Sequence, residues 1–116
     1  MAGVAEATKD NWGDLVAEGT VLVDVWGPQC APCVALTPHV EQVAEERPDL
    51  KVAKLEAPKN RRLCIDLRVM GMPTFLLFRG GQEVARLSDP DLSPARLDAW
   101  LEETVPVPPS PTTERR

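Results

Sequence analysis

The sequence predicts an α/β domain in which strands and helices alternate and a β-hairpin precedes the last helix. Short apolar runs, typical of buried strands, alternate with segments whose apolar residues recur at helical spacing. Two adjacent glycines, Gly80-Gly81, separate the last two strand-like runs, as in a hairpin. The length of 116 residues and the hydrophobic fraction of 43% suit one domain with its own core. The expected order is β-α-β-α-β-α-β-β-α, a mixed five-stranded sheet flanked by four helices.

The first half of the chain contains three expected strands and two expected helices. These are a strand over 3–7, a helix of about ten residues from Thr8 to near Gly19, a strand over 20–25, a helix over 32–46 and a strand over 50–55. Thr8 is a residue type that caps helix N-termini, and Gly19 suits the position after a helix end. The run 20–25 is apolar on both faces except at Asp24, as expected for a buried strand.

The second half contains the hairpin and the last helix. The expected elements are a turn over 58–60, a short helix to about 67, strands over 74–78 and 82–87, and a helix from Pro94 to about Glu103. Ser93 before Pro94 is a typical helix start, and the last helix is apolar on one face. The domain is therefore expected over residues 1–104. Four of the six residues 106–111 are proline, so 105–116 is expected to be an extended, disordered tail.

The composition excludes several classes of function. The net charge is −5 and no basic block is present, which disfavours binding to nucleic acid. The apolar runs are too short to cross a membrane, and the first residues have neither the basic nor the apolar part of a secretory signal. A cytoplasmic location is expected. Three cysteines are too few for a disulfide framework, so a close pair indicates catalysis or metal binding.

Such a close pair occurs in Cys30-Ala31-Pro32-Cys33, between the apolar run that ends at Trp26 and the next expected helix. A thiol in the first turn of a helix lies near free backbone N–H groups and the positive end of the helix dipole, which favour the thiolate. The second thiol is about one turn further on, close enough to form a disulfide. The pattern indicates a dithiol that cycles between two redox states.

Two other interpretations of the cysteines remain open. Buried structural cysteines would have the same spacing, although packing does not explain a proline inside the pair at a helix start. A zinc site would have to use Cys30, Cys33, Cys64 and His39. Cys33 and His39 would lie about 240° apart around one helix, which disfavours that site. Cys64 is otherwise expected to be an inert core residue, and His39 an exposed residue without a role.

Asp24 is the one carboxylate in an apolar strand, and alternation places it on the same face as Leu22, inside the fold. Burial without a partner would raise the pKa of Asp24 and make it a candidate proton acceptor. A structural buried ion pair is the other interpretation, and both can hold together.

Several further motifs occur one after another along the chain. They are Val23-Asp24-Val25-Trp26 before the paired cysteines, Pro38 five residues after Cys33, Val52-Ala53-Lys54-Leu55, Gly71-Met72-Pro73-Thr74, and the Gly80-Gly81 hairpin before the last helix. In this combination the chain resembles the thioredoxin family over about residues 3–104. The resemblance implies a thioredoxin fold.

The resemblance also implies a role for each matching residue. Cys30 would be the nucleophile that attacks a substrate disulfide, and Cys33 would be the resolving thiol. Asp24 would help to deprotonate Cys33, and Lys54 would pair with Asp24. Trp26 would have a structural role beneath the active-site loop.

The substrate would dock on residues around the dithiol. The implied set is Gln29, Ala31, Pro32, Met72, Pro73 and Pro90. Pro73 matches the family's cis-proline, which places the backbone of Met72 where an extended substrate segment pairs with it. Pro32 between the cysteines goes with a reducing pair in the family, and Ala31 replaces the more usual glycine.

Three departures from the family pattern fall on this docking surface. Gln29 stands where tryptophan is usual, Val34 stands where a lysine or arginine is common, and Pro90 stands in an acidic loop, 88–91, where glycine is usual. The surface becomes more polar and more acidic, which favours basic partners. We expect a divergent member that is a poor substrate for a general thioredoxin reductase.

The resemblance therefore implies a cytosolic thiol–disulfide oxidoreductase that mainly reduces protein disulfides. It would act as a monomer, with no cofactor or metal besides its own disulfide. Its partners would be client proteins and a reductase-type electron donor, and neither nucleic acid nor membrane. The alternative is a binding module of the same fold whose dithiol is idle or specialised.

Overall fold

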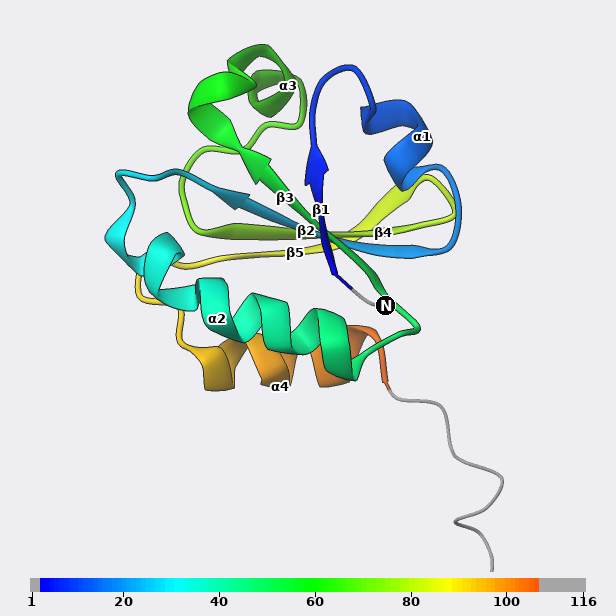
Figure 1. Ribbon diagram of the computed structural model, residues 1–116, viewed down its shortest axis with the longest axis vertical. Coiled ribbons are helices and arrows are strands. Elements are labelled where there is room, and N and C mark those ends of the chain that lie inside the picture. Colours follow the sequence, from blue (N-terminus) through cyan, green and yellow to red (C-terminus); the bar gives the residue numbers. More distant parts are fainter. Residues whose placement is uncertain (1–2, 107–116) are drawn as a thin grey trace, which may run out of the picture.

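A computed structural model describes residues 3–106, which form a five-stranded mixed sheet between two layers of helices (Figure 1). The strands are β1 (Val4–Ala7), β2 (Thr20–Trp26), β3 (Lys51–Glu56), β4 (Thr74–Arg79) and β5 (Gln82–Ser88). Their order across the sheet is β1-β3-β2-β4-β5, in which β1, β3 and β2 are parallel to one another and β4 is antiparallel to both of its neighbours, β2 and β5. The predicted α/β class, element order and mixed sheet are confirmed.

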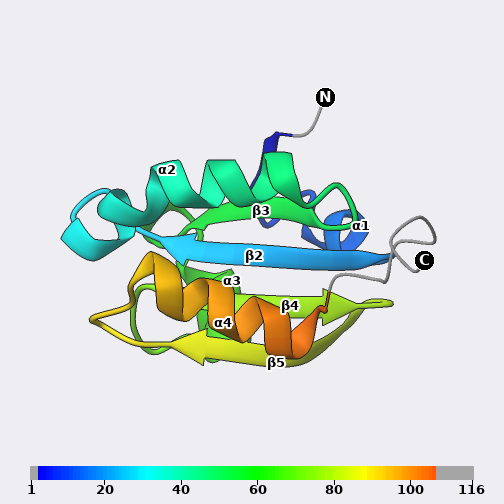
Figure 2. The same ribbon diagram turned by 90° about the horizontal axis from the view of Figure 1, so that it is seen from below.

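Two helices cover each face of the sheet. The helices are α1 (Trp12–Val16), α2 (Ala31–Glu46), α3 (Arg61–Asp66) and α4 (Pro94–Thr104), with a short 3-10 turn, η1 (Ala57–Lys59), before α3. Figures 1 and 2 show α2 and α4 side by side on one face, and α1 and α3 on the other. Among residues 3–106, none of these helices is long and apolar enough to cross a lipid bilayer.

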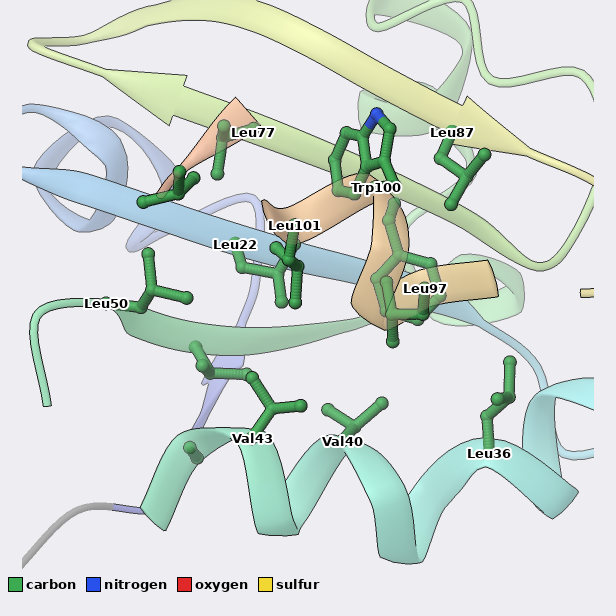
Figure 3. Close-up of a cluster of buried hydrophobic side chains, with 14 of the residues drawn as sticks. Leu22, Leu36, Val40, Val43, Leu50, Leu77, Leu87, Leu97, Trp100 and Leu101 are labelled. Carbon is green, nitrogen blue, oxygen red and sulfur yellow. The ribbon is translucent and has the colours of Figure 1, made fainter. Parts of the chain in front are cut away.

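The double coverage explains why β2 is apolar on both faces. Leu22 belongs to the larger core cluster between the sheet, α2 and α4 (Figure 3). Val21, Val23 and Val25 point the other way, into the cluster beneath α1 and α3. A central strand of a covered sheet needs apolar residues at nearly every position. Asp24, which shares the face of Leu22, is therefore an exception in an otherwise apolar core.

The hairpin between β4 and β5 turns at Gly80 and Gly81, as predicted. Both glycines have positive φ angles, +60° and +86°, the backbone geometry that a two-residue hairpin turn of this type requires. A shift in the β4–β5 register between Leu77 and Phe78, which the sequence pattern does not reveal, interrupts the ladder.

The helix predicted from Thr8 is wrong in its start and its length. Thr8 and Asn11 instead form a turn, in which the Thr8 N–H donates to Asn11 Oδ1 at 2.7 Å and the Asn11 N–H donates to Thr8 Oγ1 at 3.2 Å. The helix α1 begins only at Trp12 and has five residues. Gly19 has a positive φ, but it lies in the loop beyond the helix end. The other predicted boundaries agree with the structure to within two residues.

His39 is not the uninvolved exposed residue that the sequence predicts. Its Nε2 lies 2.7 Å from Asp98 Oδ1, so it links α2 to α4 and is only partly exposed. The pairing was not visible in the sequence because the two residues are 59 positions apart. The predicted tail, 105–116, lies outside the described residues apart from its first two. Val105, the first of them, is buried in the larger core cluster.

The Leu97→Ala substitution should strongly destabilise the domain. Leu97 is 0% exposed and lies in the cluster that joins α4 to the sheet (Figure 3). Removing a buried leucine side chain costs about 2–5 kcal/mol, because apolar contacts are lost and a cavity remains. Urea denaturation followed by circular dichroism would measure this loss. The control is Ile65→Ala on α3, where the side chain is 68% exposed and the change should stay within about 0.5 kcal/mol.

Candidate active site

The paired cysteines lie at the start of α2, directly after the loop that leaves β2. Cys30 is the N-cap residue, and its Sγ accepts a hydrogen bond of 3.3 Å from the backbone N–H of Cys33. The sulfurs form a Cys30–Cys33 disulfide with a Cα–Cα separation of 5.2 Å. Because α2 has 16 residues, its N-terminus presents free N–H groups and the positive end of a full dipole to Cys30.

The two sulfurs differ in their exposure to solvent. Cys30 is partly exposed, whereas Cys33 is 1% exposed. Gln29, Ala31 and Pro32 are all exposed, so the Cys30 side of the disulfide faces solvent and the Cys33 side faces the core. An incoming disulfide can therefore reach Cys30 first.

Asp24 is buried on the same face of the sheet as α2, as alternation predicts. It is 1% exposed, and among residues 3–106 its Oδ2 has no hydrogen-bond partner. Burial raises the pKa of Asp24 to about 7, an effect that the positive charge of Lys54 partly offsets. The carboxyl group is thus set to exchange a proton near neutral pH.

Lys54 does not form the expected ion pair with Asp24. The two residues are direct neighbours across the β2–β3 ladder, yet within the described part of the chain no salt bridge of 4.0 Å or less joins them. Instead the Lys54 ammonium donates to Thr37 Oγ1 at 3.3 Å and lies 4.1 Å from the ring centroid of Trp26. Trp26 therefore packs beside the site and holds the lysine by a cation–π contact.

The Met72–Pro73 peptide bond is cis, and Pro73 is buried immediately before β4. The side chain of Met72 crosses to the loop after β2, where a Cβ atom at Gly27 would lie 3.3 Å from its Cε. The absence of a side chain at Gly27 allows this close approach. The segment before β4 and the loop before Cys30 are therefore in contact. Sequence reasoning did not single out Gly27.

Two surface depressions flank this arrangement. A groove of about 480 Å³ is lined by Pro32, Ala35, Leu36, Pro90, Asp91, Leu92 and Pro94. A second, more apolar pocket of about 320 Å³ is lined by Ala57, Pro58, Arg61, Cys64, Ile65 and Met72. The structure thus brings Pro90 to Pro32 in one depression and places Met72 in the other. In the acidic loop, Asp89 Oδ1 accepts a 2.8 Å hydrogen bond from the Asp91 N–H, so Asp89 shapes the turn.

Cys64 is buried, as predicted, and burial raises the pKa of its thiol. Within residues 3–106 no group of three or more His, Cys, Asp and Glu side chains is arranged to hold a metal ion. The four residues considered for zinc thus form no such group among the described residues; His39 instead lies against Asp98, and Cys30 and Cys33 are bonded to each other.

Thr37 is a second site residue that sequence reasoning missed, besides Gly27. It lies four residues after Cys33, one helical turn further along α2, and its hydroxyl donates to the Cys33 carbonyl at 3.4 Å. A threonine on the inner side of a helix that covers a buried carboxylate is the signal that would have revealed it.

A dithiol at a helix N-terminus, beside a buried carboxyl group and a cis-proline segment, defines a thiol–disulfide oxidoreductase. The thioredoxin family model matches residues 3–103. A thioredoxin of Acetoanaerobium sticklandii is 33% identical over 103 residues, which cover 86% of this chain and 98% of that protein. A thioredoxin of Peptoclostridium acidaminophilum is 40% identical over 93 residues, which cover 78% of this chain and 84% of that protein. The chain belongs to the thioredoxin family, whose members are protein disulfide oxidoreductases that use a redox-active disulfide without an external cofactor.

The fold agrees with solved structures. Thioredoxin f2 of Chlamydomonas reinhardtii superposes with a TM-score of 0.83 at 24% identity, over 91% of this chain and 100% of that chain. A thioredoxin of Malassezia sympodialis superposes with a TM-score of 0.80 at 20% identity, over 89% of this chain and 91% of that chain. The arrangement of strands and helices is therefore shared with these proteins.

The Asp24→Asn substitution should stabilise the oxidised protein increasingly as the pH rises. The pKa of Asp24 is about 7 in the folded protein against an ordinary value of 3.8, so the folded state holds the proton more tightly than the unfolded state. The wild type therefore loses stability as the pH rises from about 4 to above 7, and the variant does not. The difference between them should grow by on the order of 4 kcal/mol across this window.

Urea denaturation at pH 4.5 and pH 8 would measure this difference. Asp10→Asn, at an exposed turn carboxylate, is the matched control and should show no comparable gain. A stability difference between Asp24→Asn and wild type that stays constant with pH would contradict the raised pKa of Asp24.

Proposed function

We propose that this thioredoxin family member reduces protein disulfides, with Cys30 as the nucleophile and Cys33 as the resolving thiol. In the first step the Cys30 thiolate attacks one sulfur of a client disulfide. A Cys30–client disulfide forms, and the other client sulfur leaves as a thiolate and takes up a proton. The observation that carries this assignment is the contrast between the partly exposed Cys30 and the buried Cys33.

In the second step the Cys33 thiol loses its proton and attacks Cys30. The Cys30–Cys33 disulfide forms, and the second client sulfur leaves as a thiolate, so two electrons have passed from the dithiol to the client. Asp24 is the proposed proton acceptor for Cys33. Its raised pKa supports this role, because a base is most effective when its pKa lies near the working pH.

The backbone of Met72 before Pro73 is proposed to pair with an extended client segment, while the exposed Gln29, Ala31, Pro32 and Pro90 form the surrounding contact surface. The position of Met72 against the loop before Cys30 supports this arrangement. Clients with basic residues near the disulfide are favoured, since Asp91 is exposed in the groove that also contains Pro32.

The proposed direction is reduction of the client, and the proposed electron donor is a thioredoxin reductase. Pro32 supports a reducing pair by the resemblance described above. The protein is proposed to work as a monomer in the cytoplasm, a compartment that keeps thiols reduced. The structured domain is proposed to end near residue 104.

A redox titration of the dithiol tests the direction of the reaction. The Cys30–Cys33 couple should have a midpoint near the thioredoxin value of about −270 mV in a defined thiol buffer, read by thiol labelling. A midpoint above about −180 mV would contradict a reductant and indicate an oxidant or isomerase. The absence of any two-electron transition would favour a binding module with an idle dithiol.

Single cysteine substitutions test the order of the two steps. Cys33→Ser should accumulate a covalent adduct with a disulfide peptide, because the resolving thiol is missing, whereas Cys30→Ser should form almost none. Mass spectrometry would identify the adduct and its attachment site. Cys64→Ser is the control and should keep turnover within about twofold of wild type, because Cys64 is buried on α3, on the opposite face of the sheet from α2, and takes no part in the disulfide. Equal trapping by both variants would contradict the assigned roles.

Gln29→Trp should improve reduction by a general thioredoxin reductase. An aromatic side chain beside Cys30 restores a large apolar contact, and a gain of about 1.4 kcal/mol corresponds to about tenfold in kcat/KM. Steady-state oxidation of NADPH by a bacterial reductase would measure the change. Gln42→Trp, on an exposed part of α2, is the matched control and should change nothing. Fast and equal reduction of wild type and Gln29→Trp would contradict the expectation of a divergent docking surface.

A further inference from the structure

Three residues with charged side chains lie in one row across the sheet. The strand registers place Glu6 of β1 opposite Lys54 of β3, and Lys54 opposite Asp24 of β2. All three point to the face that carries α2, since they alternate with residues of the opposite cluster. A lysine placed between two carboxylates would be expected to pair with one of them.

Lys54 pairs with neither neighbour. Its ammonium group extends along the sheet toward Trp26, where it lies 4.1 Å from the ring centroid, and donates to Thr37 Oγ1 at 3.3 Å. The Thr37 hydroxyl gives its own hydrogen to the carbonyl of Cys33 at 3.4 Å. A hydroxyl has one hydrogen and two lone pairs, so this arrangement leaves its oxygen free to accept from Lys54.

We propose that Thr37 is a positioning residue that holds the Lys54 ammonium over Trp26 and away from the Asp24 carboxyl group. The direct consequence is the unpartnered Oδ2 atom of Asp24, which is buried beside a lysine that is long enough to approach it. The inference rests on the proposed function, in which Asp24 accepts a proton from Cys33. A carboxylate in a direct ion pair would be a weaker base than one left alone.

The other charged groups around Lys54 do not account for its position. Glu6, Glu41 and Glu56 line the same pocket of about 330 Å³ as Lys54 and Trp26. Within residues 3–106 none of the three forms a salt bridge with Lys54 at 4.0 Å or less. On the other side of Asp24 in the sheet, β4 presents the apolar Phe75. The two cysteines at the start of α2 are joined in a disulfide and do not titrate. Thr37 and Trp26 are thus the groups that hold the ammonium.

The pKa of Asp24 fits this arrangement. Burial is the larger influence and raises the pKa to about 7, while Lys54 lowers it only through its charge at a distance. An opposite charge in direct contact lowers a carboxyl pKa by about 1–3. Release of Lys54 from Thr37 would allow that contact.

The test is a titration of the Asp24 side-chain carboxyl carbon by NMR in the oxidised full-length protein. Thr37→Val keeps the shape of the side chain and removes the acceptor. We expect its Asp24 midpoint to fall by about one pH unit or more relative to wild type. Thr37→Ser keeps the hydroxyl and should retain the wild-type midpoint. Backbone amide spectra of each variant verify that the fold is intact.

Thr37→Val in a Lys54→Met background separates a positioning role of Thr37 from a general structural effect. Lys54→Met alone should raise the Asp24 midpoint, because a nearby positive charge is removed. Adding Thr37→Val to it should then cause no further change, since Thr37 acts through the lysine. An equal fall with and without Lys54, or an unchanged or higher midpoint in Thr37→Val alone, would overturn the proposal. The NMR titration does not depend on turnover. Failure of the proposed disulfide reductase activity would appear instead in the trapping experiment with the cysteine variants.

Discussion

The register of strand β2 determines the geometry of the site. β2 pairs with β3 on one edge and with β4 on the other, so ladder hydrogen bonds hold it from both sides. A slip of one residue would turn Asp24 to the opposite face and place Val23 or Val25 beneath α2. The same strand ends at Trp26 and leads within four residues to Cys30. The register that buries the carboxyl group therefore also sets the position of the dithiol relative to it.

The environments of Cys30 and of Asp24 favour opposite charge states of these two groups. The N-terminus of α2 favours negative charge at Cys30, because the Cys33 N–H donates to that sulfur and the positive end of the helix dipole lies beside it. Burial disfavours negative charge at Asp24, behind the helix, and raises its pKa. Cys30 is thus stabilised as a thiolate and Asp24 as a neutral carboxylic acid, although only the end of β2 and the loop before α2 separate them along the chain. This asymmetry supports the different tasks proposed for the two thiols, which lie three residues apart.

The element order and the central site residues were predictable because short-range patterns specify them. Alternation along β2 is enough to place Asp24 inside, and a Cys-x-x-Cys at a strand-to-helix junction is enough to place Cys30 at a helix start. The beginning of α1 was not predictable, since Thr8 serves equally well as a helix cap or as a turn residue. The direction of the Lys54 side chain depends on Trp26 and on a residue of α2 seventeen positions earlier. Contacts of this kind arise only from the tertiary packing of a long, flexible side chain.

The residues proposed for the redox chemistry are buried, whereas those proposed for partner binding are exposed. Asp24 and Cys33 are buried, whereas Gln29 and Val34, which are expected to differ from the family pattern, are exposed. An exposed substitution changes the contact energy with a partner but leaves the dielectric environment and charge neighbours of the buried carboxyl group nearly unchanged. Pro32 belongs to both groups of residues, because it separates the cysteines and also lines the groove that contains Asp91. The altered partner choice proposed for this chain should therefore come from the exposed rim, while the proposed electron-transfer step should depend on the buried groups beneath it.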